Sequence, residues 1–574
     1  MIQSRRRTIS LAVAAVAGIA VVYVVRGVAQ RTPESQLVDA TVGALGGRDR
    51  ILNVRTLVLE GSGRHFNLAA MMSPTSVLHG EAVRLIRTID MAHSRMKYWQ
   101  SRRFLLPARF DQQLGETRQF SMLDGDVAFT VPADGSIMGS WSDSNPDGLT
   151  SIGSTWGIGS PGRPVTMDVW PTNYPAEPPP PQRNFGNAAT TRRIEMLEYP
   201  LTIMREVLAG ANVTQARELG NWQVVDITTR TGEQFTLAVD RFTKLPAWLS
   251  HVEGNNYWGD TVVKTSFSAY RTMDGLVLPR RLTSTFGPFF QADYELTSTT
   301  IDAEIGDLSA PSAVRNASAP PPQALQLMVE DVPGTSGMWK ITPKQGEIRP
   351  DQRPDNSGTC LIELSDHLVM FDAPVGDGFV QAVVAKAREL RPDKPITQLI
   401  LSHFDPGHTA GLRAGVAQGM ELITDKGNAD AFAQLVGRAH TINPDALARN
   451  PRPPKITAVD DAYEIKDSLR DIRIYHKVGD PESATMVMAY IPRDRVLVNT
   501  DGWNVITAQT PNDSDSPSMF DNIVKRHLDV VRHVPLHSIG MPTQAEFMKQ
   551  LEYTRSVEYQ FFRLAQRLRV DNGF

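Results

Sequence analysis

Two histidines and an aspartate lie close together at residues 402–411, in a spacing that suits a metal ion. The segment reads Ser-His-Phe-Asp-Pro-Gly-His-Thr-Ala-Gly, so the three side chains belong to His403, Asp405 and His408. The apolar run at residues 398–401 predicts a buried strand before the segment, and a helix is expected to follow it. Side chains at such a strand-to-helix turn converge, and imidazole and carboxylate groups are good donors to a divalent cation.

This segment resembles the metallo-β-lactamase signature, His-x-His-x-Asp-His followed by a small residue and glycine. His403 and His408 match the first and last histidines of that signature. Asp405 stands where the second histidine is expected. Gly407 stands where the aspartate is expected, and glycine has no side chain that could coordinate a metal. The resemblance therefore implies a metal site whose middle donors are altered.

Further landmarks of the same family follow in order over residues 330–550. They lie at residues 369–374, 395–403, 479–483, 486–492, 496–501 and 534–538. The first of them resembles the strand ending in aspartate that precedes the first helix in this family. The ordered landmarks imply that residues 329–574 form an αββα sandwich of metallo-β-lactamase type.

The family pattern places three more donors in this chain. Glu482, in the turn at residues 479–483, stands where the family has another histidine, and Asp480 is the near alternative. His476, just upstream of this turn, is one extra candidate. Asp501 matches the bridging aspartate at the end of its strand, and His537 matches the final histidine.

The implied ligands form two sets. The first set comprises His403, Asp405 and Glu482, with Asp501 shared; the second set comprises His408, His537 and Asp501. Oxygen donors in place of imidazoles shift the preference away from Zn²⁺ towards harder cations. We expect one or two divalent ions, Zn²⁺, Mn²⁺ or Fe²⁺, because two of the three altered positions keep a donor. A metal-free remnant of the fold is the alternative.

A hydrolase is the activity that the resemblance implies. A bound metal would activate water to attack an ester, thioester, lactam or related bond. The catalytic residues would be Asp501, which orients the metal, and Asp405, which accepts a proton. Two alternatives stay open: an inactive scaffold or periplasmic protein that binds an apolar ligand, and an oxygenase that uses two histidines and one carboxylate.

The length and the charge of the chain narrow its class. At 574 residues the chain is too long for one domain. The formal net charge of −4 gives no basic field for nucleic acid, so a small-molecule substrate or an apolar ligand is the expected partner. Cys360 is the only cysteine, which excludes an internal disulfide and a cysteine-based zinc cluster.

Residues 1–30 have the pattern of a targeting segment. Three arginines at residues 5–7 precede an apolar run at residues 10–25, and small residues follow at 27–29. The run is short for a bilayer span, which favours a signal peptide, with an N-terminal membrane anchor as the alternative. Either segment predicts a location in the bacterial periplasm or elsewhere outside the cytoplasm, by the general secretory or the twin-arginine route.

Residues 31–309 are expected to form an antiparallel β domain with helices. Short runs that alternate between apolar and polar residues fill most of this part. Helices are predicted at residues 33–52, ending in Gly46 and Gly47, and at residues 191–208. The segments at residues 44–47 and 57–63 resemble the start of periplasmic lipoprotein-carrier-like β domains. That resemblance implies a half-barrel whose apolar face either holds a ligand or is only core.

A proline-rich linker is predicted at residues 310–328, before the metallo-β-lactamase-like part. The expected fold is thus two-domain, with the β half-barrel first and the αββα sandwich second.

Overall fold

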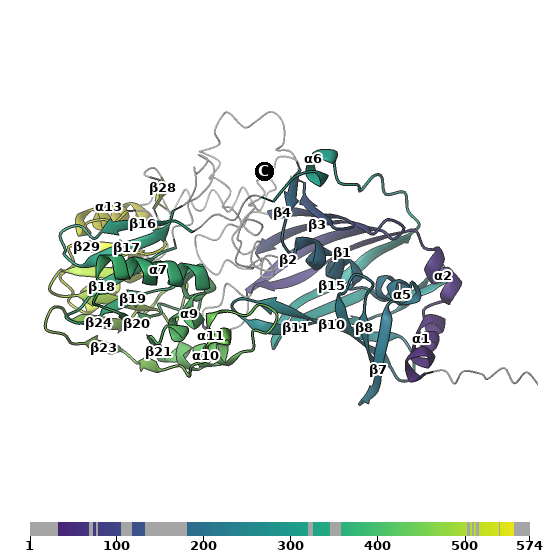
Figure 1. The fold of residues 1–574 in the computed structure, drawn as a ribbon. Coiled ribbons are helices and arrows are strands. Elements are labelled where there is room, and N and C mark those ends of the chain that lie inside the picture. Colours follow the sequence, from purple (N-terminus) through teal and green to yellow (C-terminus); the bar gives the residue numbers. More distant parts are fainter. Residues whose placement is uncertain are drawn as a thin grey trace, which may run out of the picture.

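The computed structural model, drawn in Figure 1, describes most of the chain. The described residues are 32–67, 73–75, 79–104, 117–131, 181–319, 325–344, 357–501, 505–507, 510–511, 516–538 and 540–555. The targeting segment expected at residues 1–30 lies outside them. No helix among the described residues is long and apolar enough to cross a membrane.

Among the described residues, a thirteen-stranded sheet that is antiparallel throughout occupies the first half of the chain. In spatial order its strands are β6 (Gln182–Asn184), β5 (Val127–Thr130), β4 (Thr117–Asp124), β3 (Arg95–Phe104), β2 (His79–Asp90), β1 (Thr56–Asn67), β15 (Phe289–Ile301), β14 (Arg281–Phe286), β11 (Gly259–Ser268), β10 (Pro246–Asn255), β9 (Gln234–Asp240), β8 (Trp222–Thr228) and β7 (Asn212–Leu219). A small hairpin joins β12 (Arg271–Met273) to β13 (Leu276–Leu278). The predominance of β structure predicted from the alternating runs is confirmed.

Four helices pack against one face of this sheet through a shared apolar core. They are α1 (Pro33–Ala44), α2 (Arg48–Asn53), α4 (Ala188–Leu197) and α5 (Pro200–Leu208). The predicted end of the first helix at Gly46 and Gly47 is confirmed, since their φ angles of +119° and +98° leave the helical region. The rest of the predicted range 33–52 belongs to the separate helix α2. The helix predicted at residues 191–208 is also two helices, because Tyr199 before Pro200 is extended.

The connecting segment contains a short helix, α6 (Ser312–Arg315). Ala310 and Val314 are buried against Met122 and Phe129 of the large sheet. Part of the predicted linker, residues 320–324, lies outside the described residues.

Two further sheets occupy the second half of the chain. The first consists of β16 (Leu327–Asp331), β17 (Met338–Pro343), β18 (Thr359–Glu363), β19 (Leu368–Phe371), β20 (Ile396–Ile400), β21 (Glu421–Asp425) and β22 (Ile456–Val459). The second consists of β23 (Ala462–Ile465), β24 (Ile472–His476), β25 (Val487–Ile491), β26 (Val496–Asn499) and β29 (Arg532–Pro535). A separate pair joins β27 (Val505–Thr507) to β28 (Thr510–Pro511).

These two sheets pack face to face, and helices cover their outer faces. Alternate residues of both sheets, such as Ile362 and Ile474, share one core. The other face of the seven-stranded sheet packs against α7 (Asp377–Leu390), α9 (Leu412–Ala417), α10 (Lys426–Gly437) and α11 (Ala446–Arg449). The other face of the five-stranded sheet packs against α12 (Ser516–Lys525) and α13 (Gln544–Arg555). One further turn of helix, α8 (Pro406–Thr409), follows β20.

Candidate metal centre

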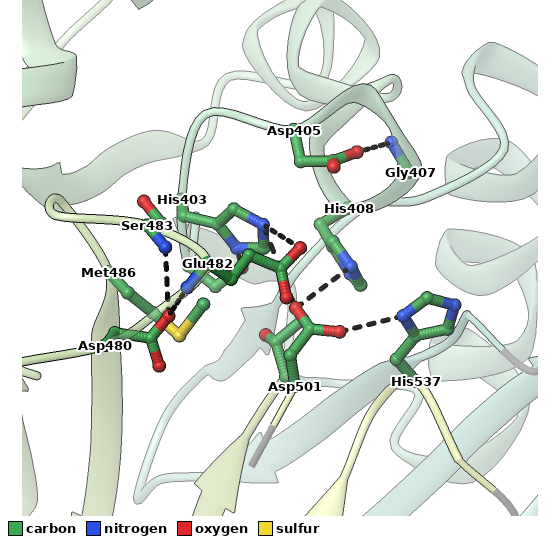
Figure 2. A network of polar contacts seen from close by, with 12 residues as sticks. His403, Asp405, Gly407, His408, Asp480, Glu482, Ser483, Met486, Asp501 and His537 are labelled. Atoms are coloured by element: carbon green, nitrogen blue, oxygen red, sulfur yellow. Dashed lines mark hydrogen bonds and ion pairs between the residues drawn. The ribbon is translucent and has the colours of Figure 1, made fainter. Parts of the chain in front are cut away.

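The six predicted ligands come together at one edge of the two facing sheets. His403, Asp405 and His408 lie in the segment after β20 and on α8. The other three lie in loops at the ends of strands: Glu482 before β25, Asp501 after β26 and His537 after β29. Figure 2 shows the side chains of His403, His408, Glu482, Asp501 and His537 pointing toward one another. The carboxyl ends of β20, β26 and β29 therefore converge on one site.

Three buried donors, His403, His408 and Asp501, form what we call the imidazole group. Oδ2 of Asp501 lies 3.4 Å from Nε2 of His408 and 3.8 Å from Nε2 of His403. The side chain of Asp501 is fully buried, and its Oδ2 accepts no hydrogen bond from the described residues. Two imidazole nitrogens thus face one buried carboxylate oxygen at distances too long for hydrogen bonds.

A second set of donors, the carboxylate group, consists of His403, Asp405 and Glu482. Nε2 of His403 lies 3.7 Å from Oε1 of Glu482. Oδ1 of Asp405 accepts a hydrogen bond from the backbone N–H of Gly407 at 2.5 Å, which caps α8. A β-carbon at Gly407 would lie 2.9 Å from that same oxygen, so the capping carboxylate occupies the space a side chain would need. This set equals the first predicted set without Asp501.

His537 lies beside Asp501 and outside both groups. Its Nδ1 is 2.8 Å from Oδ1 of Asp501, and its side chain is 36% exposed. Burial on its own would raise the pKa of the Asp501 carboxyl, but the imidazoles of His408 and His537 hold that pKa well below its ordinary value. Asp501 is therefore ionised and in contact with three imidazoles, counting His403.

These donors fit a divalent cation. Donors about 2.1 Å from a tetrahedrally coordinated ion lie about 3.4 Å from one another. The distances of 3.4 and 3.8 Å around Oδ2 of Asp501 are close to that separation. A buried carboxylate oxygen without a hydrogen-bond donor is costly unless a cation or a proton compensates it. Geometry and donor chemistry thus agree on a metal ion.

Asp372, which directly follows β19, contacts the segments that carry the imidazole group. It is fully buried and accepts hydrogen bonds from the backbone N–H of Ser402 at 2.7 Å and from the hydroxyl of Thr500 at 2.6 Å. Its Oδ2 lies 3.6 Å from Nδ1 of His408. Burial raises the pKa of Asp372 to about 6. One carboxyl thus links the segments that carry His403, His408 and Asp501.

The turn that carries Glu482 rests on a buried ion pair. Nζ of Lys477 contacts Oδ2 of Asp480, and both side chains are fully buried. Oδ1 of Asp480 accepts hydrogen bonds from the backbone N–H groups of Glu482 and Ser483, each at 2.9 Å. Asp480, the alternative ligand, therefore holds the turn, and Glu482 is the residue that reaches the other donors.

Some of these supporting residues escaped the sequence reasoning. Asp372 was only a landmark of the resemblance, although an aspartate that ends an apolar strand is a recognisable signal. Lys477 has no distinctive pattern around it. His476, by contrast, is the extra candidate predicted from the sequence; its Nδ1 lies 2.7 Å from Oδ2 of Asp425, and it belongs to neither donor group.

Comparisons with known proteins find similarity only at the level of structure. No protein-family model matches the chain, and no curated protein matches it either. Similar solved structures include a metallo-β-lactamase from Pontibacter korlensis (17% identity, 40% of this chain and 98% of that chain, TM-score 0.31). A metallo-β-lactamase from Hirschia baltica (18%, 40% and 98%, 0.30) and the mono-zinc form of FIM-1 from Pseudomonas aeruginosa (12%, 40% and 96%, 0.30) are also similar. The similarity is of low identity and assigns no role to any residue.

Proposed function

We propose that residues 329–574 form a metal-dependent hydrolase of the metallo-β-lactamase type, with one or two divalent ions in an oxygen-rich site. The observation that supports this most directly is the buried Oδ2 of Asp501, which faces His403 and His408 without a hydrogen-bond donor among the described residues. Glu482 and Asp405 add carboxylate oxygens beside His403. The substrate class we propose is a small molecule with an ester, thioester, lactam or related bond.

The residues of the site have separable roles in such a reaction. A divalent ion, when bound, supplies Lewis-acid chemistry, which acidifies water and polarises the group under attack. Asp501, ionised at neutral pH, holds the imidazoles of His408 and His537 in their orientations. Asp405 uses Oδ1 to cap α8, and its second carboxylate oxygen can accept a proton from water. The hydroxyl of Ser402, 3.1 Å from Nδ1 of His403, keeps Nε2 of that ring turned towards the site.

The donor set favours a metal harder than Zn²⁺. Carboxylates at two positions replace imidazoles, and oxygen-rich sites suit Mn²⁺ and Fe²⁺ better than histidine-rich sites do. Carboxylates also neutralise more of the charge of the ion, so it acidifies water less strongly. We therefore propose Mn²⁺ or Fe²⁺ ahead of Zn²⁺ and a slower hydrolysis than a histidine-rich site would give.

Elemental analysis of the full-length protein, purified without chelators from a bacterial host, tests this function. The parent is expected to hold at least one equivalent of a divalent metal, and His403→Ala to hold less than roughly a tenth of the parent's content. His367→Ala is the matched control, because His367 lies near the surface beside Asp366. A parent with less than roughly a tenth of an equivalent, or a His403→Ala variant with as much metal as the parent, would refute the proposal.

We further propose a two-domain layout, with residues 31–309 as a β half-barrel like the periplasmic lipoprotein carriers and residues 310–328 as the connection. One apolar core draws all its buried members from between Leu37 and Ile301, which supports a separate first domain. The same core fills the sheet face beneath α1, α2, α4 and α5, so helices already cover much of the face that an apolar ligand would use. We therefore favour a structural role for this sheet over that of a carrier.

The location that we propose is extracytoplasmic, in the periplasm of a bacterium, with membrane association through residues 1–30 as the alternative. Support comes from the arginines at residues 5–7 and the apolar run at residues 10–25. Fractionation of cells that express the full chain or a chain without residues 1–30 tests it. Cytoplasmic recovery of both chains would reject export, and recovery of the full chain with membranes would favour the anchor.

A further inference from the structure

We propose that a turn from the large β-sheet positions the ligand-bearing segment at residues 403–409. The turn, which we call the aromatic turn, comprises residues 255–259, from the last residue of β10 to the first residue of β11. Its Tyr257 and Trp258 are 1% and 2% exposed, and both belong to the core that covers the helical face of the seven-stranded sheet. The inference rests on the proposed function, because it takes residues 403–409 to hold a metal.

Phe404, which lies between two predicted ligands, is held by these aromatic rings. The ring centroids of Tyr257 and Trp258 lie 6.2 and 5.8 Å from the centroid of Phe404. From the second half of the chain, the ring centroid of Phe432 on α10 lies 5.6 Å from the centroid of Phe404. Phe404 itself is 4% exposed. Its ring therefore contacts both halves of the chain, and a shift of the aromatic turn moves the backbone next to His403.

A chain of two hydrogen bonds joins Tyr257 to the backbone of a predicted ligand. The hydroxyl oxygen of Tyr257 lies 3.0 Å from Oγ1 of Thr409. The hydroxyl of Thr409 in turn donates a hydrogen bond to the carbonyl oxygen of Asp405 at 2.7 Å. Thr409 has one hydroxyl proton, and it is used on Asp405. Tyr257 must therefore be the donor to Thr409. The phenol thus fixes the rotamer of Thr409, which in turn holds the carbonyl of Asp405 at the start of α8.

The aromatic turn is itself firmly attached to both halves of the chain. Oδ1 of Asn255 accepts hydrogen bonds from the backbone N–H groups of Tyr257 and Trp258, at 2.9 and 2.8 Å. The backbone N–H of Asp260 donates to the carbonyl of Ala439 at 2.7 Å. A β-carbon at Gly259, whose φ is +69°, would lie 2.5 Å from that carbonyl oxygen, so the two backbones are in close contact. A turn fixed at both ends can transmit its position to its neighbours.

The carboxylate of Asp260 strengthens the same attachment. It accepts hydrogen bonds from the backbone N–H groups of Thr441 and Ile442, at 2.7 and 3.2 Å. Arg438 donates to the carbonyl of Trp258 at 3.1 Å. Tyr257 contacts Thr409 and Phe404, which are not predicted metal ligands, so it is a positioning residue that acts through these two side chains.

Hydrogen exchange of the metal-free, full-length protein tests the positioning role without any metal. In Tyr257→Phe, amides of residues 403–411 are expected to exchange about tenfold faster, because Thr409 loses its donor in a buried place. Tyr199→Phe is the control, since its hydroxyl donates to the carbonyl of Pro279 at 3.1 Å, away from the site. Unchanged exchange in a folded Tyr257→Phe protein would overturn the inference.

Variants of Thr409 provide a second test that leaves the tyrosine intact. Thr409→Ser keeps the hydroxyl and is expected to match the parent, whereas Thr409→Val is expected to show the faster exchange. Adding Tyr257→Phe to Thr409→Val should change the exchange no further, because the two residues act through one hydrogen bond. Effects that add in the double variant, or a Thr409→Val protein identical to the parent, would contradict the proposed chain of contacts.

Titration with Co²⁺ alone connects the positioning to metal binding. The dissociation constant for Co²⁺ is expected to rise about tenfold in Tyr257→Phe and to stay unchanged in Tyr199→Phe. The visible absorption of bound Co²⁺ should change in the first variant, because it follows ligand geometry. A parent that binds no Co²⁺ would count against the proposed metal site, while the exchange data still decide the positioning role. Equal affinity and an equal spectrum in Tyr257→Phe and the parent would reject the coupling.

Discussion

The imidazole group and the carboxylate group share His403 but differ in how the protein supports them. The segments of the imidazole group are joined by Asp372, a buried carboxyl that accepts hydrogen bonds from Ser402 and Thr500 and whose pKa is raised by burial to about 6. The turn that carries Glu482 of the carboxylate group is supported by the buried ion pair of Lys477 and Asp480. The imidazole group is therefore held by hydrogen bonds to one buried carboxyl, and the carboxylate group by a buried pair of opposite charges. Substitutions should affect the two groups separately.

Asp501→Asn is expected to have the largest effect, because its carboxylate faces both histidines of the imidazole group and contacts His537. An amide keeps the shape but removes the negative charge that a cation requires. We expect the metal content, measured by elemental analysis, to fall below roughly a tenth of the parent's. Asp529→Asn is the control, since Asp529 pairs with Arg495 on the surface. Retention of the parent's metal content in Asp501→Asn would mean that the carboxylate group binds on its own.

Lys477→Met is expected to weaken the support of the carboxylate group alone. Removing one partner of a buried ion pair leaves the other charge uncompensated, which costs about 3–5 kcal/mol of unfolding free energy. Urea denaturation of the metal-free protein measures this loss. Lys426→Met is the control, because its pair with Asp460 is exposed and should leave the midpoint unchanged. Equal midpoints for the two variants would show that the pair does not hold the turn.

Acidification should destabilise the protein through His533, a buried histidine outside the site. His533 on β29 is fully buried, stacks on Phe547 and lies 2.7 Å from Gln544. Burial lowers its pKa to about 4, against an unfolded value near 6.5. Between these two pKa values the native state therefore binds fewer protons than the unfolded state does. The unfolding free energy consequently falls by about 3 kcal/mol as the pH drops from about 6.5 to about 4.

The variant His533→Gln tests this assignment. Its unfolding free energy should depend less on pH in that window than the parent's does, when both are measured by urea denaturation at several pH values. Other buried histidines, such as His65, also have a pKa lowered to about 4, so only the difference between the two proteins is informative. Parallel pH profiles for parent and variant would show that His533 does not contribute.

Local patterns were sufficient to predict most elements and the positions of the donors. The apolar run at residues 398–401 indicated a strand, and the structure has β20 at Ile396–Ile400. His403 follows β20, and Asp501 and His537 follow the neighbouring strands β26 and β29, so the carboxyl ends of these strands bring three donors to one edge. The break between α4 and α5 was missed by the prediction of one helix at residues 191–208, although a residue before proline avoids the helical region, as Tyr199 does.

Contacts between distant parts of the chain could not be predicted in this way. The hydroxyl of Tyr257 meets Thr409 across 152 positions of sequence. Nothing near Tyr257 marks it as different from the other aromatic residues of the β-rich half. The pairing of Lys477 with Asp480 is local, but its burial depends on the sheets packed around it. The residues that support the site therefore depend on how distant elements pack, whereas the ligand positions can be predicted from residue type and strand order.

Glu482→His is expected to have the smallest effect, and it tests the difference in donor chemistry most sharply. The substitution returns an imidazole to the position where the carboxylate group has an oxygen donor, while the support from Lys477 and Asp480 stays in place. The affinity for Zn²⁺ relative to Mn²⁺ should rise by about tenfold, because imidazole suits Zn²⁺ better than it suits Mn²⁺. Competition between the two ions, read by elemental analysis after dialysis, measures the ratio.

Glu464→His is the matched control for that substitution, since Glu464 pairs with Arg473 on an exposed part of the five-stranded sheet. An unchanged ratio in Glu482→His would mean that Glu482 does not contact the ion, and the carboxylate group would then be only a polar neighbour of the imidazole group. A shifted ratio with unchanged total metal content would instead mean that the carboxylate group selects which metal binds. The imidazole group of His403, His408 and Asp501 would then determine how much metal the protein retains.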